Sequence, residues 1–231
     1  TPKAPKIETE YYLTGNINSW NNNDKTYAVK NSGADVYTDP VFNITLTAAQ
    51  VAGQSKVDFK LTPKSKIGTE DWSECISAAK EDGKLVGNNA GGNISFDVVP
   101  GAKVYKLSFN LLDQTWTCTP LSFDDYLYMA GDANGWKHID YLYGKEHDGK
   151  YTGYMYLNKN GFKFCTQPNW SGDNYGEGIS TSGGNIMMTE AAGYYKVDVD
   201  LANSTMSLTA ITRIGVIGDA TVGGWGSDQA M

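Results

Sequence analysis

The chain repeats itself, and this duplication constrains the fold more than any other feature of its 231 residues. Four blocks of sequence occur twice, in the same order. They are YYLTGNINSW (11–20) and YLYMAGDANGW (126–136), VDFKL (57–61) and GFKFC (161–165), GGNI (91–94 and 183–186), and the runs 104–121 and 194–211. Repetition of several blocks with loops of different length between them predicts two copies of one structural module.

The repeat predicts where the modules begin and end. We expect the first module over residues 11–122 and the second over 123–212. Residues 1–10 are polar and proline-spaced, so we expect a linker from a missing N-terminal domain. The segment IGVIGDATVGGW resembles the start of each copy, so residues 213–231 are expected to be the start of a truncated third module. The alternative is an orphan strand, which without a partner should be poorly ordered.

Each copy is predicted to be all-β. Apolar and polar residues alternate with period two in 104–111 and again in 194–201, which gives a strand one buried face and one wet face. Clusters of glycine, asparagine and proline separate such segments. We therefore expect tandem Ig-like β-sandwich modules, with Trp116 in the first core. The segment 70–83 is helix-like and is an insertion confined to the first copy.

Composition excludes several classes of function. The formal net charge is −7 and the lysines are scattered, so the chain lacks the basic surface that nucleic acids require. Three cysteines and two histidines match no zinc-ligand spacing, and we predict neither a metal nor a cofactor. No apolar run reaches the roughly 18 residues that a transmembrane helix needs.

Lysine and tryptophan side chains recur together in both copies. Alternation in VDFKL and GFKFC puts Lys60 and Lys163 on the side of the strand opposite the apolar residues. Trp20 and Trp136 follow the glycine turn in the first loop of each copy, while Trp72 and Trp170 follow the lysines. The tryptophans have polar neighbours, which favours exposed platforms, although the alternative of core packing stays open.

Exposed tryptophans next to polar side chains are typical of carbohydrate sites. The C–H face of a pyranose ring is weakly positive and suits the negative face of an indole. The sugar hydroxyls then need donors and acceptors, which lysine and asparagine supply. Asn93 and Asn185, each in a GGNI block, are candidates for such a contact, and a turn-capping role is the alternative.

The order of these motifs resembles a known family. A glycine–asparagine–tryptophan turn, an FKF strand, a loop tryptophan, GGNI and a YKV strand are similar to the tandem modules of SusE/SusF-like proteins. The resemblance implies non-catalytic binding of starch and other α-glucans by two aromatic platforms and a basic residue in each module. It also implies a lipoprotein at the surface of the bacterial outer membrane, anchored through a missing N-terminus. The expected partners are the polysaccharide and other glycan-uptake proteins of a polysaccharide-utilisation system.

Carried over residue by residue, the resemblance implies two carbohydrate-binding sets. They are Trp136, Lys163, Trp170 and Asn185 in the second copy, and Trp20, Lys60, Trp72 and Asn93 in the first. The first copy departs from the pattern because its insertion lengthens the loop between Lys60 and GGNI. We therefore expect the first module to bind weakly or not at all.

The sequence does not predict an enzyme. Glycoside hydrolysis needs two carboxylates at a set separation. The closest candidates, Asp124, Asp125, Asp173 and Glu177, have no counterparts kept in the other copy. Two further alternatives remain: a protein of the same fold that binds another glycan, and an Ig-like spacer whose tryptophans pack inside.

Overall fold

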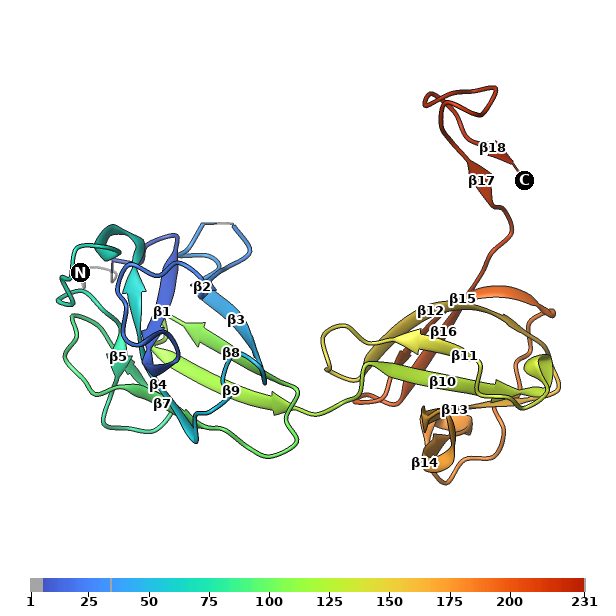
Figure 1. The fold of residues 1–231 in the computed structure, drawn as a ribbon, viewed down its shortest axis with the longest axis horizontal. Helices are drawn as coiled ribbons and strands as arrows, with labels where there is room; N and C mark the ends of the chain where they lie inside the picture. Colours follow the sequence, from blue (N-terminus) through green and yellow to red (C-terminus); the bar gives the residue numbers. More distant parts are fainter. Residues whose placement is uncertain (1–5, 34, 231) are drawn as a thin grey trace. The chain divides into compact units, whose positions relative to one another are not determined.

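The computed structural model describes residues 6–33 and 35–230, and the chain divides between Ser122 and Phe123 into two compact units (Figure 1). Both units are built from strands and turns, and the all-β prediction is confirmed. The helical segments in the described residues are 3-10 turns of three residues each. None of them has the length and apolar character that a membrane-crossing helix requires.

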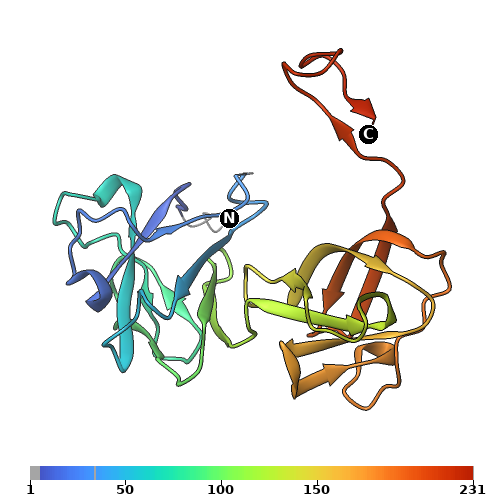
Figure 2. The same ribbon diagram turned by 45° about the vertical axis from the view of Figure 1, so that its right-hand side comes forward.

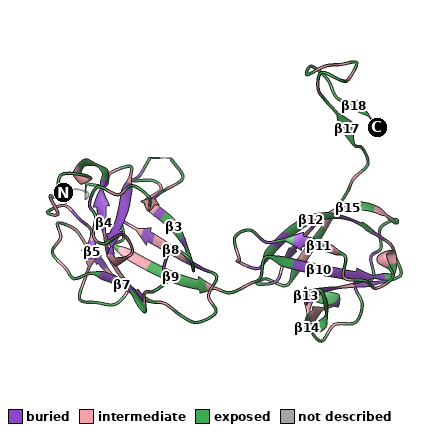
Figure 3. Cartoon of the chain, in the orientation of Figure 1, coloured by how far each residue is buried: buried purple, intermediate pink, exposed green. Residues whose placement is uncertain are grey.

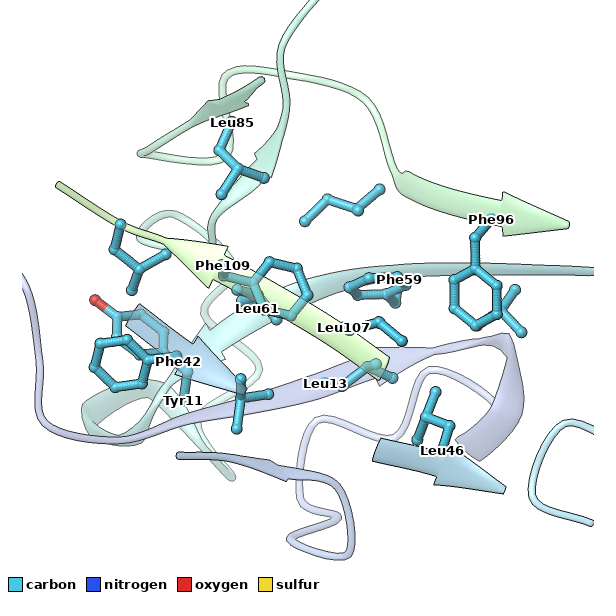
Figure 4. Packing of buried hydrophobic residues seen from close by; sticks show 14 of the residues in the cluster. Tyr11, Leu13, Phe42, Leu46, Phe59, Leu61, Leu85, Phe96, Leu107 and Phe109 are labelled. Carbon is cyan, nitrogen blue, oxygen red and sulfur yellow. The ribbon is translucent and has the colours of Figure 1, made fainter. Parts of the chain in front are cut away.

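The first unit is a sandwich of two sheets. Its strands are β1 (Tyr11–Gly15), β2 (Ala28–Val29), β3 (Val41–Thr47), β4 (Lys56–Pro63), β5 (Ser77–Ala78), β6 (Leu85–Val86), β7 (Ile94–Asp97), β8 (Val104–Asn110) and β9 (Thr115–Leu121). One sheet has the order β2-β1-β4-β7 and the other β3-β8-β9, while β5 and β6 form a separate hairpin. Side chains of both sheets meet in one core, as Figure 4 shows. Phe59 of β4 and Phe109 of β8, for example, contact edge to face at 6.0 Å.

The second unit carries the same plan in one continuous sheet. Its strands are β10 (Tyr126–Gly131), β11 (Asp140–Tyr143), β12 (Lys150–Leu157), β13 (Phe162–Gln167), β14 (Asn169–Tyr175), β15 (Gly193–Asp200) and β16 (Thr205–Ala210). They are ordered β14-β13-β10-β11-β12-β15-β16. The buried residues of β10 and β13 pack with those of β12 and β15 in a second core. Figure 3 shows buried positions, in purple, along β4 and β10.

Strand pairing repeats between the units, as the sequence duplication predicts. Gly15 pairs with Phe59 in the first unit, and Gly131 pairs with Phe162 in the second. The GGNI blocks also coincide, because Ile94 faces Phe59 and Ile186 faces Phe162. The runs 104–121 and 194–211 both form hairpins. The inward residues predicted from alternation are buried in both hairpins: Tyr105, Leu107, Phe109, Leu111, Tyr195, Val197, Val199 and Leu201.

The predicted helix at 70–83 is wrong. This segment forms turns and the short strand β5, and its Ile76 exchanges backbone hydrogen bonds with Leu61 of β4. Pairing with a neighbouring strand therefore satisfies backbone groups that a helix would have satisfied internally. Trp116 is half-buried rather than fully buried and stacks on Phe109 at 6.0 Å.

Residues near both ends of the described chain have partners elsewhere in the chain. Residues 1–5 of the expected linker lie outside the described residues, but Ile7 is buried in the first core and Glu8 accepts a hydrogen bond from the backbone N–H of Ser65. Residues 6–10 therefore pack on the first unit. Toward the other end, β17 (Gly215–Val216) pairs with β18 (Gln229–Ala230), so the strand that the alternative leaves unpaired has a partner, and a truncated third module stays a prediction (Figure 2).

Candidate carbohydrate-binding sites

The first loop of each unit holds its tryptophan in an uncommon backbone conformation. A 3-10 turn follows β1 as η1 (Asn16–Asn18) and follows β10 as η3 (Asp132–Asn134). After each turn, Trp20 and Trp136 have φ angles of 58° and 61°. Positive φ is uncommon for residues other than glycine. Its recurrence at both tryptophans indicates that the turn, and not the side chain's own preference, sets where each indole lies.

An asparagine side chain closes each turn. In the second unit Asn134 accepts a hydrogen bond from the N–H of Gly131 at 3.1 Å and donates to the carbonyl of Met129 at 3.0 Å and to Asp140 at 2.8 Å. Asn18 makes the equivalent bonds to Gly15, Leu13 and Asp24 in the first unit. This role was not among the sequence-based expectations, although the asparagine recurs at the same place in both copies.

The glycine before each turn is required by close packing. A Cβ atom on Gly131 would lie 2.4 Å from the Cβ of Phe162, and one on Gly15 would lie 2.6 Å from the Cβ of Phe59. Both distances are far inside ordinary contact. The carbonyls of the same glycines accept hydrogen bonds from the N–H groups of Trp136 at 2.7 Å and Trp20 at 2.8 Å. Each glycine thus fixes the start of the loop that carries the indole.

The structure brings together the two predicted tryptophans of the second unit. The ring centroids of Trp136 and Trp170 are 6.3 Å apart and the ring planes are tilted by 36°. Trp170 lies on β14 and is 48% exposed, and Trp136 is half-buried. Neither ring is sealed in the core of the unit, so both present surface to solvent.

His138 is a third ring at this site that the sequence analysis missed. It meets Trp170 edge to face with a centroid distance of 4.6 Å and an angle of 79°. Its Nε2 atom is buried and has no hydrogen-bond partner within the described part of the chain. Burial lowers the pKa of the imidazole, because desolvation disfavours the charged form.

The first unit also pairs its two predicted tryptophans. Trp20 and Trp72 have centroids 6.2 Å apart and planes tilted by 55°, and both are half-buried. The insertion, which has no equivalent in the second unit, therefore places Trp72 beside Trp20 and close to the glycine turn.

Both lysines are less free than the sequence suggests. Each lies on the non-core side of its strand, since its neighbours along the strand are core residues: Phe59 and Leu61 beside Lys60, and Phe162 and Phe164 beside Lys163. The expectation of wet-face donors needs correction, because both are half-buried under a loop. The Nζ of Lys163 donates to the carbonyl of Gly183 at 2.9 Å. The Nζ of Lys60 donates to the carbonyl of Gly91 at 3.4 Å, to Ser77 at 3.4 Å and to Asn89.

These lysine contacts repeat between the units. Gly91 and Gly183 are the first residues of the two GGNI blocks. Asn93 and Asn185 lie in the same blocks and are exposed. Within the described residues neither amide side chain has a hydrogen-bond partner, so nothing supports the turn-capping alternative for them. Asn185 packs beside Gly161 at the start of β13, where a Cβ on the glycine would lie 3.1 Å from its own.

Comparison with known proteins identifies the first unit. The model of the family described as "SusF, first starch specific CBM" matches residues 6–120. The first unit belongs to this family. The whole chain is similar in structure to SusF from Bacteroides thetaiotaomicron, with a TM-score of 0.60 and 22% sequence identity over 98% of this chain and 54% of that chain. The chain thus spans about half the length of that SusF structure, whose likeness concerns the fold. No curated protein matches the chain with a significant score.

The resemblance to SusE/SusF-like proteins is therefore confirmed. The matched residues include the complete candidate set of the first unit, from Trp20 to Asn93. The second unit repeats the strand pairing and the tryptophan pair of the SusF-like first unit.

The reactive side chains near these candidate sites are few in the residues that the structure describes. Cys165 lies on the same strand as Lys163, but burial raises the pKa of its thiol to about 11, which makes it a poor nucleophile. In the described residues no group of three or more histidine, cysteine, aspartate or glutamate side chains is arranged to hold a metal ion. In each unit two tilted indoles lie near amide and ammonium donors.

Proposed function

We propose that this SusF-like chain binds starch and maltooligosaccharides without hydrolysing them. The proposed sites are the Trp136–Trp170 pair with Lys163 and Asn185, and the Trp20–Trp72 pair with Lys60 and Asn93. The family that matches the first unit is described as starch-specific, which supports this ligand class. The observation that carries the proposal is the recurrence of a tilted tryptophan pair after the same glycine turn in both units.

The tilt of the rings favours a curved ligand. Planes at 36° and 55° form a bent platform, on which successive sugar rings of a flat chain could not both lie. An α-glucan curves along its length, so neighbouring glucose units can each offer a C–H face to one indole. Stacking on an aromatic ring contributes about 1–3 kcal/mol in nucleic-acid sites. Two such contacts near the upper end of this range correspond to modest affinity, on the order of tens to hundreds of micromolar.

The lysine environments indicate that the second unit is the stronger binder. An ammonium group has three donors. Lys163 gives one to Gly183, which leaves two for sugar hydroxyls. Lys60 has three acceptors within its own unit. Together with the greater exposure of Trp170, this supports tighter binding by the second unit and weaker binding by the first.

Carboxylates beside the Trp136 loop serve the loop itself. Asp140 accepts a hydrogen bond from Asn134, and Asp132 accepts bonds from Asn158 and Asn160. A glycosidase would instead direct two carboxylates at the scissile bond. This arrangement supports a binding role without catalysis.

We place this activity at the surface of the bacterial outer membrane. Kinship with SusF supports a lipid-anchored protein that works with other glycan-uptake proteins in a polysaccharide-utilisation system. Its role there would be to hold the polysaccharide close to the cell.

Gel electrophoresis in native gels that contain polysaccharide tests the ligand class. We expect amylopectin to retard the chain, whereas xylan and dextran should not. Replacing Trp20, Trp72, Trp136 and Trp170 together by alanine should abolish the retardation. Trp225→Ala is the matched control, because Trp225 is 71% exposed and lies outside both pairs. Retardation by xylan would favour a binder of another glycan, and no retardation by any glycan would favour a structural spacer.

A further inference from the structure

The second unit contains a cavity apart from its tryptophan pair. It measures about 600 Å³ and lies over β11, β12, β15 and β16, where the β11–β12 loop forms one wall. Binding sites for small ligands commonly have volumes of 300–1,000 Å³. The candidate site described above uses none of the residues that line this cavity.

An exposed aromatic ring stands at the edge of the cavity. Tyr143 of β11 is 48% exposed, whereas Tyr151 of β12 and Met206 of β16, which also border the cavity, direct their side chains to the core on the other face of the sheet. Tyr143 points away from the core, because its neighbour Leu142 is fully buried. An exposed tyrosine at the edge of a cavity offers both a ring face for stacking and a hydroxyl for hydrogen bonding.

Polar groups from three strands also line the cavity. Lys150 and Thr152 lie on β12, facing Asp200 and Asp198 of β15. Asp198 pairs with Lys196 at 3.1 Å, and Asp200 accepts two hydrogen bonds from Asn203. Their positions are therefore fixed. Carboxylates form charge-assisted hydrogen bonds with hydroxyl donors such as those of a sugar.

The charge of the lining selects against an anion. Four carboxylates line the cavity with two lysines, and the lining contains no arginine. The acidic residues are Glu146, Asp148, Asp198 and Asp200, and the basic residues are Lys145 and Lys150. The excess of two negative charges disfavours the binding of phosphates and acidic polysaccharides. A neutral molecule with many hydroxyls suits a rim that offers both acceptors and donors.

A run of tyrosines connects this cavity to the strands of the tryptophan site. Tyr126 lies 5.5 Å from Tyr143 and 6.3 Å from Tyr128, measured between ring centroids. Tyr128 is on β10 and pairs with Cys165 of β13, two residues from Lys163 and on the same, non-core side of the sheet. One aromatic surface therefore continues from the strand beside Lys163 to the rim of the cavity.

We propose that the cavity beside Tyr143 is a second saccharide-binding site of the second unit, which takes a short stretch of neutral glucan chain. Tyr143 is the stacking platform, and Thr152, Asp198 and Lys150 bind the hydroxyls. The inference rests on the proposed function, because the ligand is the same polysaccharide. A long chain held at the tryptophan pair would meet this site as a second contact on the same molecule.

Nuclear magnetic resonance of the full ¹⁵N-labelled chain with maltoheptaose tests the proposal. We expect two sets of shifted amide resonances in the second unit, one around Trp136 and Trp170 and one around Tyr143, Thr152 and Asp198. Tyr143→Ala should weaken binding at the second set by about tenfold, as expected for loss of one stacking contact, and leave the first unchanged. Tyr194→Ala is the matched control, because Tyr194 is 61% exposed on β15 outside the cavity, and it should change neither set.

The outcomes separate the two proposals. Shifts around Trp136 and Trp170 with no shift around the cavity, at saturating maltoheptaose, would overturn the second site and leave the proposed function intact. Shifts around the cavity alone would support the second site and overturn the tryptophan site. No shift in either place would overturn both.

Discussion

Neighbouring groups hold Trp136 and Trp170 in position, so substitutions of those groups should affect ligand binding. The backbone at Trp136 is fixed by its hydrogen bond to Gly131, and the ring of Trp170 rests against the edge of His138. Indoles that are already in place lose little conformational entropy when a sugar binds. The residues behind the platform should therefore matter almost as much as the platform.

Lys163→Ala should weaken maltoheptaose binding by the second unit about three- to tenfold, while Lys60→Ala should change binding by the first unit less. The physical reason is the number of N–H groups left free, since Lys60 donates to three protein acceptors and Lys163 to one. Isothermal titration of each variant, made in a chain whose other tryptophan pair is replaced by alanine, measures the two effects separately. A larger loss for Lys60→Ala would contradict this account of the lysines.

His138 should titrate below its ordinary pKa of 6.5, because burial beside Trp170 disfavours the imidazolium ion. The unfolded chain then binds the proton at a higher pH than the folded one. The stability of the second unit should therefore fall as the pH drops below about 6.5, and His138→Gln should reduce this fall. The pH dependence of the imidazole proton resonances measures the pKa directly, and a midpoint at or above 6.5 would refute the assignment.

At the scale of the element, the turn after β10 holds the indole of Trp136 in position. Asn134 ties this turn to the strand before it and to the start of β11. Asn134→Ala removes all three bonds and should lower the free energy of unfolding of the second unit by about 1–3 kcal/mol. It should also weaken maltoheptaose binding, because Trp136 loses its fixed position.

Urea unfolding followed by tryptophan fluorescence, together with isothermal titration, measures both effects of this change. Asn185→Ala provides the control for stability, because Asn185 is exposed and has no hydrogen-bond partner in the part of the chain that the structure describes. Equal losses of stability in the two variants would contradict the role of Asn134 in holding the turn.

Elements were predictable from the sequence where one local rule decided them. Alternation alone placed Tyr105 and Val197 inside, because a strand with one covered face has no other choice. The segment 70–83 has a helical pattern but does not form a helix, because Ile76 pairs with Leu61, which lies fifteen residues away in sequence. Local propensity could not reveal that partner.

The candidate site was predictable for similar reasons. The repeat identified all four tryptophans and both lysines as candidates, because each copy keeps them near the same blocks. His138 could not be found in this way, since it has no counterpart in the other copy and its contact with Trp170 joins the turn before β11 to β14, about thirty residues further along the chain. The loops that cover Lys60 and Lys163 could not be predicted either. Alternation along a strand shows on which face a side chain lies, but not which loop packs over it.

At the scale of the whole molecule, the two proposed tryptophan sites on one chain should change how a polymer is bound. Once one unit holds a polysaccharide, the second meets it at a high effective concentration, so avidity can exceed either affinity about a hundredfold. Replacing Trp136 and Trp170 by alanine should therefore weaken binding to amylopectin much more than binding of maltoheptaose by the first unit. Retardation gels and isothermal titration compare the two quantities, and equal losses would indicate that the units act independently.

The most direct test of the central claim is a crystal structure of the chain with maltoheptaose. The account predicts glucose rings stacked on the indoles of Trp136 and Trp170, with the Nζ of Lys163 within hydrogen-bond distance of a sugar hydroxyl. Sugar density that leaves both of these indoles uncovered would contradict it.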